Sequence, residues 1–163
     1  MIKQLIPEGF CLQCQGCCRF EHPDSVWSPN LLDKDREALV TCDVPAFSIL
    51  NNKKIRLVRS RTQGNFICSF LDDKDNRCKV YAFRPFECQL YPCLVNRSNK
   101  NIFLAVDLKC PFAQEQQKSE AFQRHIQYLT EFFSRPEICN ILNKNPQIIQ
   151  EYPEVRNLAA LNI

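Results

Sequence analysis

The side chains best suited to chemistry in this sequence are its cysteines, 11 among 163 residues. Thiolates are strong ligands for zinc and for the iron of iron–sulfur clusters. Near the start of the chain, Cys11, Cys14 and Cys17 follow one another at a shared spacing. Two cysteines separated by two residues can curl around one metal while backbone N–H groups point at the sulfurs. This spacing predicts a loop that binds a metal.

Cys18 directly follows Cys17 and adds a constraint. Adjacent side chains diverge along most backbones, so the pair is not expected to chelate one small mononuclear centre. The two thiolates can instead contact two neighbouring centres, or one cluster whose metals are widely spaced. Gly16 suits such a loop, because a residue without a Cβ can take a positive φ and approach the metal closely.

A second group of cysteines lies further along the chain. Its members are Cys68, Cys78, Cys88, Cys93 and Cys110. Their wide spacings do not form a local chelate, so these thiols can meet only where the fold brings them together. Hairpin ends and a proline-constrained loop can do this, and the group is therefore a candidate second half of the site.

Composition excludes several classes of protein. A chain of this length buries roughly 70% of the surface of its unfolded form, so it needs no disulfides to fold. Pro7 and Gly9 interrupt the start of the chain, which lacks a signal peptide's apolar region, and no segment is long enough to span a membrane. Many cysteines without an export signal favour the reducing cytoplasm. The net charge of +3 is too small to indicate a polyanion binder.

The middle of the chain predicts one short helix and a small sheet. Ser28 and Pro29 are expected as N-cap and first-turn residues of a helix over 30–40. The predicted strands are 55–61, 66–71 and 102–106. A hairpin connection at 62–65 joins the first two strands, and a second turn at 72–76 precedes Cys78.

The remaining segments are predicted to be irregular or helical. Two prolines bracket an irregular stretch at 85–92. Apolar residues at the helical period predict an amphipathic helix over 119–133, ended by Pro136. Shorter helical segments are expected around 137–144 and 147–161.

These elements predict an α+β fold. A small irregular antiparallel sheet and cysteine-rich metal-binding loops are expected to pack on C-terminal helices. The whole of 1–163 is expected to form a single domain, in which 10–112 is the metal-binding region and 113–163 the helical region.

The order and spacing of the cysteines resemble one family. The pattern runs Cys11-x-x-Cys14-x-x-Cys17-Cys18, Cys68-x-Phe70-Leu71, Cys78-Lys-Val-Tyr81-x-x-Arg84-Pro85-x-x-Cys88-x-x-Tyr91-Pro92 and Cys110-Pro111. Over about residues 10 to 112 it looks like the CxxCxxCC family, cysteine-cluster proteins of the YkgJ type described as zinc- or iron-chelating. The resemblance implies eight metal ligands: Cys11, Cys14, Cys17, Cys18, Cys68, Cys78, Cys88 and Cys110.

One branch of that family is the flagellin lysine N-methylases, which implies redox or methyl-transfer use of the centre. This chain is much shorter than those enzymes, so only the metal site is carried over from the resemblance. The sequence departs from the family at Cys93, where an apolar residue is expected after Tyr91-Pro92. Cys93 either replaces or supplements a family ligand.

Eight thiolates suffice for two 4Fe–4S clusters or for two closed zinc sites. The cysteine doublet, together with the iron–sulfur descriptions that the resemblance implies, favours iron–sulfur, in one or two clusters, with zinc as the alternative. We therefore expect a metal-binding protein that works in electron transfer or redox chemistry with an unidentified protein partner, electron donor or electron acceptor. The alternatives are a structural zinc module that binds a partner without catalysis, and a metal-dependent enzyme similar to the lysine methylases.

Arg84 is a candidate cofactor-binding residue, because it lies four positions before Cys88. A guanidinium beside a cluster would donate to a sulfur and raise the reduction potential. The alternative is an ion pair of Arg84 with Asp72, Asp73 or Glu87.

Several weaker features have ordinary structural interpretations. Cys42 and Cys139 lie outside the pattern and are expected to be small core residues. His22 follows the first cysteine group, but a lone histidine in a polar loop usually faces solvent. The basic residues of 53–61 could follow a nucleic acid. A solvated strand face is the favoured interpretation, so no nucleic acid and no membrane is expected as a partner.

Overall fold

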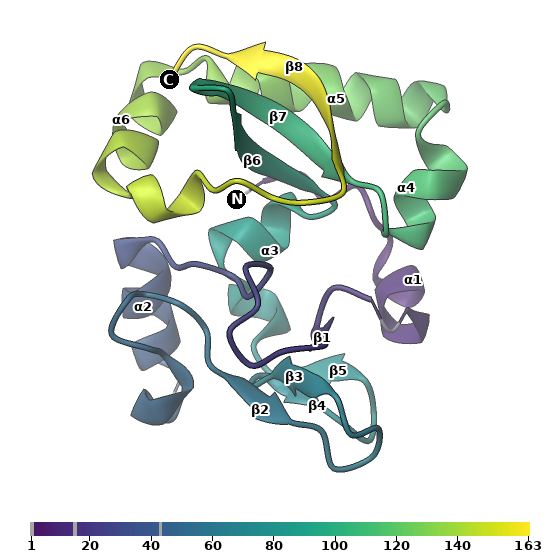
Figure 1. The fold of residues 1–163 in the computed structure, drawn as a ribbon, viewed down its shortest axis with the longest axis vertical. Helices are drawn as coiled ribbons and strands as arrows, with labels where there is room; N and C mark the ends of the chain where they lie inside the picture. Colours follow the sequence, from purple (N-terminus) through teal and green to yellow (C-terminus); the bar gives the residue numbers. More distant parts are fainter. Residues whose placement is uncertain (1, 15, 43) are drawn as a thin grey trace. The chain divides into compact units, whose positions relative to one another are not determined.

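The cysteines are carried by short helices and small antiparallel sheets. A computed structural model describes residues 2–14, 16–42 and 44–163. Internal contacts divide the chain into two compact units, unit 1 over Met1–Gln89 and unit 2 over Leu90–Ile163. In Figure 1 unit 1 runs from purple to teal and unit 2 from teal to yellow. The contacts thus divide the chain at Gln89, whereas the single-domain organisation stays a prediction.

Unit 1 contains two small sheets and three short α-helices. Its elements are α1 (Glu8–Gln13), β1 (Arg19–Phe20), α2 (Asp33–Val40), the 3-10 helix η1 (Ala46–Ser48), β2 (Leu57–Arg59), β3 (Phe66–Cys68), β4 (Leu71–Asp72), β5 (Arg77–Cys78), the 3-10 helix η2 (Tyr81–Phe83) and α3 (Phe86–Leu90). β3 is the central strand of an antiparallel β1-β3-β2 sheet, and β4 and β5 form a separate hairpin. The two predicted turns therefore lie where the sequence places them.

A hydrophobic core underlies these sheets. Leu31 and Leu39 from the α2 region pack with Ile55, Ile67 and Phe70, and all five side chains are buried. Burial of such side chains supplies most of the stability of a small unit, at about 1.5–3 kcal/mol each. The cysteines of β3 and β5 are thus attached to strands that pack on a hydrophobic core rather than to free loops.

Unit 2 is built on a three-stranded antiparallel sheet. Its elements are β6 (Cys93–Ser98), β7 (Asn101–Asp107), α4 (Pro111–Gln116), α5 (Glu120–Phe133), α6 (Pro136–Lys144), the 3-10 helix η3 (Pro146–Ile148) and β8 (Val155–Leu161). β7 lies between β6 and β8. Ser119 caps α5 by accepting a hydrogen bond from the Phe122 amide, and α5 contacts β8 (Figure 1).

The α+β class, with small antiparallel sheets and C-terminal helices, is confirmed. Three local predictions were wrong. Beyond the 3-10 helix η3, the segment 147–161 is not helical, because Val155–Leu161 pairs with residues 102–107 of β7 and buries Leu161. Ladder hydrogen bonds and burial outweigh the helix propensity of its alanines and leucines.

The start of the second helix was also predicted wrongly. α2 begins at Asp33, because the Asp35 carboxylate accepts a hydrogen bond from the Leu32 amide at 2.9 Å. The expected cap, Ser28, instead donates its hydroxyl to the Ile55 carbonyl oxygen at 2.6 Å. A serine hydroxyl can bond either nearby or distant backbone groups, and here it bonds the carbonyl oxygen of Ile55 instead of capping the helix.

The irregular stretch at 85–92 was the third wrong prediction, since most of it forms α3. The first cysteine loop likewise begins within a helix, because Cys11 lies in α1. Among the described residues, no helix is both long and apolar enough to cross a membrane.

Candidate metal centre

Three thiols of the site are anchored on the core of unit 1. Cys68, at the end of β3, is buried in that core, and Cys18 and Cys78 pack against it. The Cys68 amide donates to the Cys18 carbonyl oxygen at 3.0 Å, which joins the two cysteine groups through the backbone. Cys78 ends β5 and pairs with Leu71 of β4. Sequence-distant cysteines are thus brought together by strand pairing.

The first cysteine group is also tied to the turn between β4 and β5. The Asn76 side-chain amide donates to the Cys14 carbonyl oxygen at 2.9 Å. Asn76 has a φ of 53°, a left-handed conformation that asparagine tolerates better than most residues. Arg19 donates to the Asn76 side-chain oxygen at 3.2 Å, so the turn and the cysteine run hold each other in place.

The cysteine doublet does not diverge as expected. The Sγ atoms of Cys17 and Cys18 lie 4.0 Å apart. Two sulfurs bound tetrahedrally at 2.3 Å to one zinc would be about 3.8 Å apart. The expectation that the adjacent side chains diverge was therefore wrong, because this backbone turns both sulfurs to the same side. Whether the two thiols bind one metal stays a prediction.

Hydrogen bonding between Cys17 and Cys18 shifts the pKa values of the two thiols in opposite directions. It raises the pKa of Cys17, which burial raises further, and it lowers the pKa of Cys18. The positive charges of Arg19 and Arg84 also lower the pKa of Cys18. Cys18 is therefore the first of the pair to become a thiolate, the form that binds a metal.

Other thiols surround Cys18. Burial raises the pKa of Cys88, and the next contributions come from the nearby thiols of Cys68 and Cys18. The charge of Cys11 also raises the pKa of Cys17, so the Cys11 thiol lies near these thiols. The members that interact in this way, called here the thiol cluster, are Cys11, Cys17, Cys18, Cys68, Cys78 and Cys88.

Cys14 completes the predicted cysteines of unit 1. A Cβ on Gly16 would lie 3.3 Å from the Cys14 sulfur, tighter than ordinary van der Waals contact. Because Gly16 has no side chain, its backbone can lie close to the Cys14 sulfur. The sequence suggested a close approach of Gly16 to the metal, and the structure shows one to a sulfur instead.

The last two predicted cysteines lie together in unit 2. Cys93, the first residue of β6, and Cys110, the N-cap of α4, are both almost fully buried. Burial, with a smaller contribution from Cys110, raises the pKa of Cys93 to about 12. The Tyr91 hydroxyl donates a hydrogen bond to Asp107 at 2.8 Å. Burial raises the pKa of Cys110, and a hydrogen bond between Tyr91 and Cys110 lowers it. Their ligation of the centre stays a prediction.

Arg84 is held beside the thiol cluster by a set of hydrogen bonds. Its guanidinium lies 3.8 Å from the centre of the Tyr81 ring and donates to the Gln4 side-chain oxygen at 3.0 Å. Gln89 binds the Arg84 carbonyl oxygen at 2.6 Å. The positive charge of Arg84 lowers the pKa of Cys18. It also lowers the pKa of Cys78, but burial raises that pKa by more.

The carboxylates considered as partners of Arg84 have other partners. Asp73 accepts from Arg19 at 3.1 Å, Asp72 accepts from the Lys74 amide, and Glu87 accepts from the Asn30 amide at 2.6 Å. The Nε atom of Arg84 is buried and has no hydrogen-bond partner within the described part of the chain.

Sequence reasoning missed Arg19. Its side chain is only 7% exposed, and its Nε atom, like that of Arg84, is buried without a hydrogen-bond partner among the residues described. The signal was an arginine directly after the cysteine doublet, but a charge at that place is ordinarily solvated, and only strand β1 brings it inside.

The residues judged to be structural lie outside the thiol cluster. His22 is exposed, which agrees with a solvent-facing role. The Cys42 and Cys139 thiols donate to the carbonyl oxygens of Ala38 and Phe133, each at 3.3 Å. Both are half-buried rather than core residues.

The donor set fits a soft metal. All eleven cysteines are free thiols, and six of them form one cluster on a buried base. As they stand, no three His, Cys, Asp or Glu side chains in residues 2–14, 16–42 and 44–163 are close enough to hold one ion. Thiolate ligands select zinc, copper(I) and iron–sulfur clusters over hard cations.

Raised thiol pKa values give the metal-free chain a stability that depends on pH. Burial raises the pKa of Cys68, Cys78 and Cys88 above the ordinary value of 9.0, so each favours the folded state while protonated. This stabilisation is complete below pH 9 and falls above it, by up to about 1.4 kcal/mol per pH unit for each thiol. Urea unfolding of the reduced, metal-free chain at pH 8 and pH 10 measures the fall, and a Cys88→Ala variant should show a smaller one. Equal stability at both pH values would contradict it.

Comparison with protein families gives one match. Residues 10–111 match the model of the CxxCxxCC family, whose description is "Putative zinc- or iron-chelating domain". No curated protein and no solved structure matches the chain. The matched segment covers more than half of the 163 residues and contains every cysteine of the thiol cluster. The chain therefore belongs to the CxxCxxCC family of zinc- or iron-chelating domains.

Proposed function

We propose that the thiol cluster holds an iron–sulfur centre of the 4Fe–4S type and that the protein uses it in electron transfer or redox chemistry. The observation that carries the proposal is the gathering of six free thiols, Cys18 among them, on the core of unit 1. Such a centre accepts and returns single electrons at a potential that the surrounding protein sets.

The number of thiols supports at least one cluster. A 4Fe–4S cluster uses four cysteine thiolates, and unit 1 supplies seven of the cysteines in the family pattern. Two such clusters would need eight thiolates, which equals the number of cysteines in the family pattern. Unit 1 therefore has enough thiols for one cluster, whether or not Cys93 and Cys110 bind a metal.

The buried arginines support a redox role. Arg19 and Arg84 each place a positive charge next to Cys18, and each keeps one buried N–H without an acceptor among the described residues. A buried donor without an acceptor costs about 1–3 kcal/mol. Thiolate or sulfide sulfur would remove this cost, and the same N–H groups and charges would then favour the reduced state.

A structural zinc site is the second candidate, and one observation favours it. The 4.0 Å between the Cys17 and Cys18 sulfurs is close to the separation of two sulfurs on one zinc ion. In that case the metal would be redox-silent, and its removal would unfold unit 1. No observation at the thiol cluster favours a lysine methylase-like enzyme over these two candidates.

Reductive titration tests the redox proposal. Anaerobically purified protein is expected to bleach in the visible range on addition of dithionite and to recover its absorption on reoxidation. A colour that does not respond to dithionite would refute a redox role, whatever the metal content.

Arg84→Gln is expected to lower the reduction potential. Loss of one positive charge near a buried centre removes an interaction of about 1–3 kcal/mol, which is about 40–130 mV for one electron. Potentiometric titration of the absorption measures the shift. Arg84→Lys should retain most of the potential, and Arg61→Gln, an exposed arginine of the same unit, should retain all of it. An Arg84→Gln potential equal to that of the unmodified protein would assign Arg84 a structural role only.

A further inference from the structure

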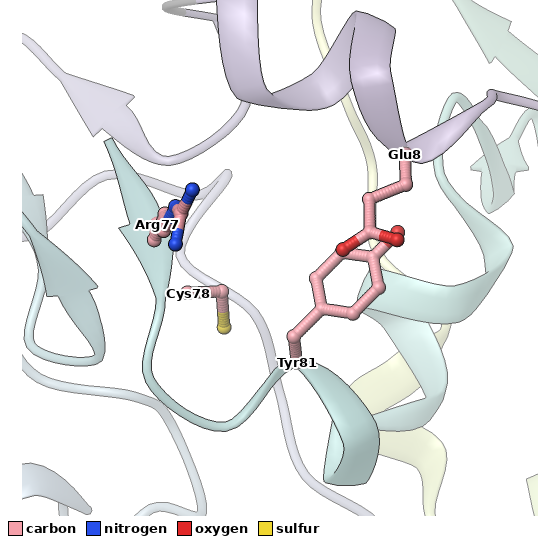
Figure 2. A pocket seen from close by; sticks show the side chains of 4 residues that line it. All are labelled: Glu8, Arg77, Cys78 and Tyr81. Atoms are coloured by element: carbon pink, nitrogen blue, oxygen red, sulfur yellow. The ribbon is translucent and has the colours of Figure 1, made fainter. Parts of the chain in front are cut away.

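Unit 1 has a pocket beside Cys78, and its other lining residues are not predicted metal ligands. Its volume is about 210 Å³, and it is lined by Glu8, Arg77, Cys78 and Tyr81. Figure 2 shows Arg77 on one side, Glu8 and Tyr81 on the other, and the Cys78 thiol between them. One thiol of the cluster is therefore open to a small molecule from this side.

The two sides of the pocket carry opposite charges. Glu8 is the first residue of α1 and Arg77 the first residue of β5, and both side chains are exposed. None of the ion pairs among the described residues joins them. A carboxylate binds an ammonium group, and a guanidinium binds a carboxylate through two parallel hydrogen bonds. Together the walls fit a ligand that carries both charges.

Tyr81 adds a fixed and neutral polar group. Burial raises the pKa of Tyr81, and the charges of Cys11 and Glu8 nearby raise it further, although Arg84 opposes them. Its hydroxyl thus remains a hydrogen-bond donor at neutral pH. The Arg84 guanidinium lies over the ring at 3.8 Å and restricts its orientation.

The volume limits the size of the ligand. One water occupies about 30 Å³ in the liquid, so the pocket has room for about seven groups of that size. Sites for drug-sized ligands are larger, at about 300–1,000 Å³. A molecule of about five to seven non-hydrogen atoms fits, which is the size of a small α-amino acid.

We propose that this pocket binds a small zwitterionic molecule of the α-amino acid type, with its carboxylate on Arg77 and its ammonium group on Glu8. The central atoms of the ligand then lie against the Sγ atom of Cys78. Binding itself depends on the two charged side chains, whereas the position of the ligand next to a metal rests on the proposed function.

Isothermal titration calorimetry of the full-length, anaerobically purified protein tests this proposal. L-Alanine is the zwitterionic probe, and propionate and ethylamine each carry only one of its two charges. Alanine is expected to bind one site per chain, and each single-charge probe to bind about tenfold or more weakly, since each lost charged hydrogen bond contributes about that factor. Comparable binding of propionate or ethylamine would mean a simple ion site and would overturn the proposal.

Variants locate the binding. Glu8→Gln and Arg77→Gln should each weaken alanine binding about tenfold or more, because each removes one of the two ionic contacts. Glu37→Gln and Arg61→Gln change exposed residues of unit 1 that do not line the pocket, and they should change nothing. Alanine that fails to bind, or that binds Glu8→Gln and Arg77→Gln as well as the unmodified chain, would refute the site.

Metal analysis of the same samples separates this inference from the proposed function. Metal-loaded protein that does not bind alanine would refute the pocket alone. Protein that binds alanine through Glu8 and Arg77 but contains no iron would refute the iron–sulfur centre and leave the pocket supported. All four variants should keep the metal content of the unmodified chain, because none removes a thiol.

Discussion

Replacement of Cys18 by serine is expected to remove the metal, with iron per chain falling about tenfold or more. The pKa of Cys18 is lowered, which favours its thiolate, and Cys18 interacts with Cys17, Cys68, Cys78 and Cys88. A serine hydroxyl has nearly the same size but is not ionised at neutral pH, so it cannot replace the sulfur as a ligand. Iron and acid-labile sulfide per chain are the quantities to measure.

Cys42→Ser is the matched control for this experiment. The Cys42 thiol belongs to the same unit and donates to a backbone oxygen, a bond that a hydroxyl can also make. Its metal content should equal that of the unmodified chain. A full complement of metal in Cys18→Ser, or equal losses in both variants, would contradict the assignment of Cys18 to the centre.

The second large effect is expected on stability, from Asp35→Ala. The Asp35 carboxylate is buried and accepts hydrogen bonds from the amides of Leu32 at 2.9 Å and of Phe86 at 3.1 Å. It thereby joins the start of α2 to the start of α3, the helix that carries Cys88. Alanine leaves both amides buried without a partner, which costs about 2–5 kcal/mol of the free energy of unfolding.

Denaturant unfolding of the metal-free chain measures this loss, and two further variants calibrate it. Asp35→Asn keeps one acceptor oxygen and should lose less than Asp35→Ala. Asp33→Asn removes an exposed charge in the same helical turn, paired with Lys53 at 2.7 Å, and should cost less than about 1 kcal/mol. Equal losses in Asp33→Asn and Asp35→Ala would show that Asp35 does not join the two helices.

Local sequence signals were sufficient to predict much of the fold. The hairpin turn between β2 and β3, the turn between β4 and β5, and helix α5 all follow from residues within a few positions. Strand β8 could not be predicted in this way. Its pairing with β7 joins residues about fifty positions apart, and local propensity carries no information about that distance.

The site divides in the same manner. Spacing alone indicated the first cysteine group, because a local chelate is a property of neighbouring residues. The approach of Cys68, Cys78 and Cys88 to Cys18 depends on strand pairing and on α3, and the burial of Arg19 depends on β1. The sequence could therefore identify the thiols, but not which of them surround one another or which charges lie beside them.

Metal and sulfide content tests the central claim most directly. Protein purified without oxygen should be coloured and contain about four iron atoms and four acid-labile sulfides for each cluster. Visible absorption and elemental analysis of one sample give the colour and the stoichiometry together. A colourless protein that contains stoichiometric zinc, no iron and no sulfide would contradict the iron–sulfur assignment and make the thiol cluster a structural zinc site.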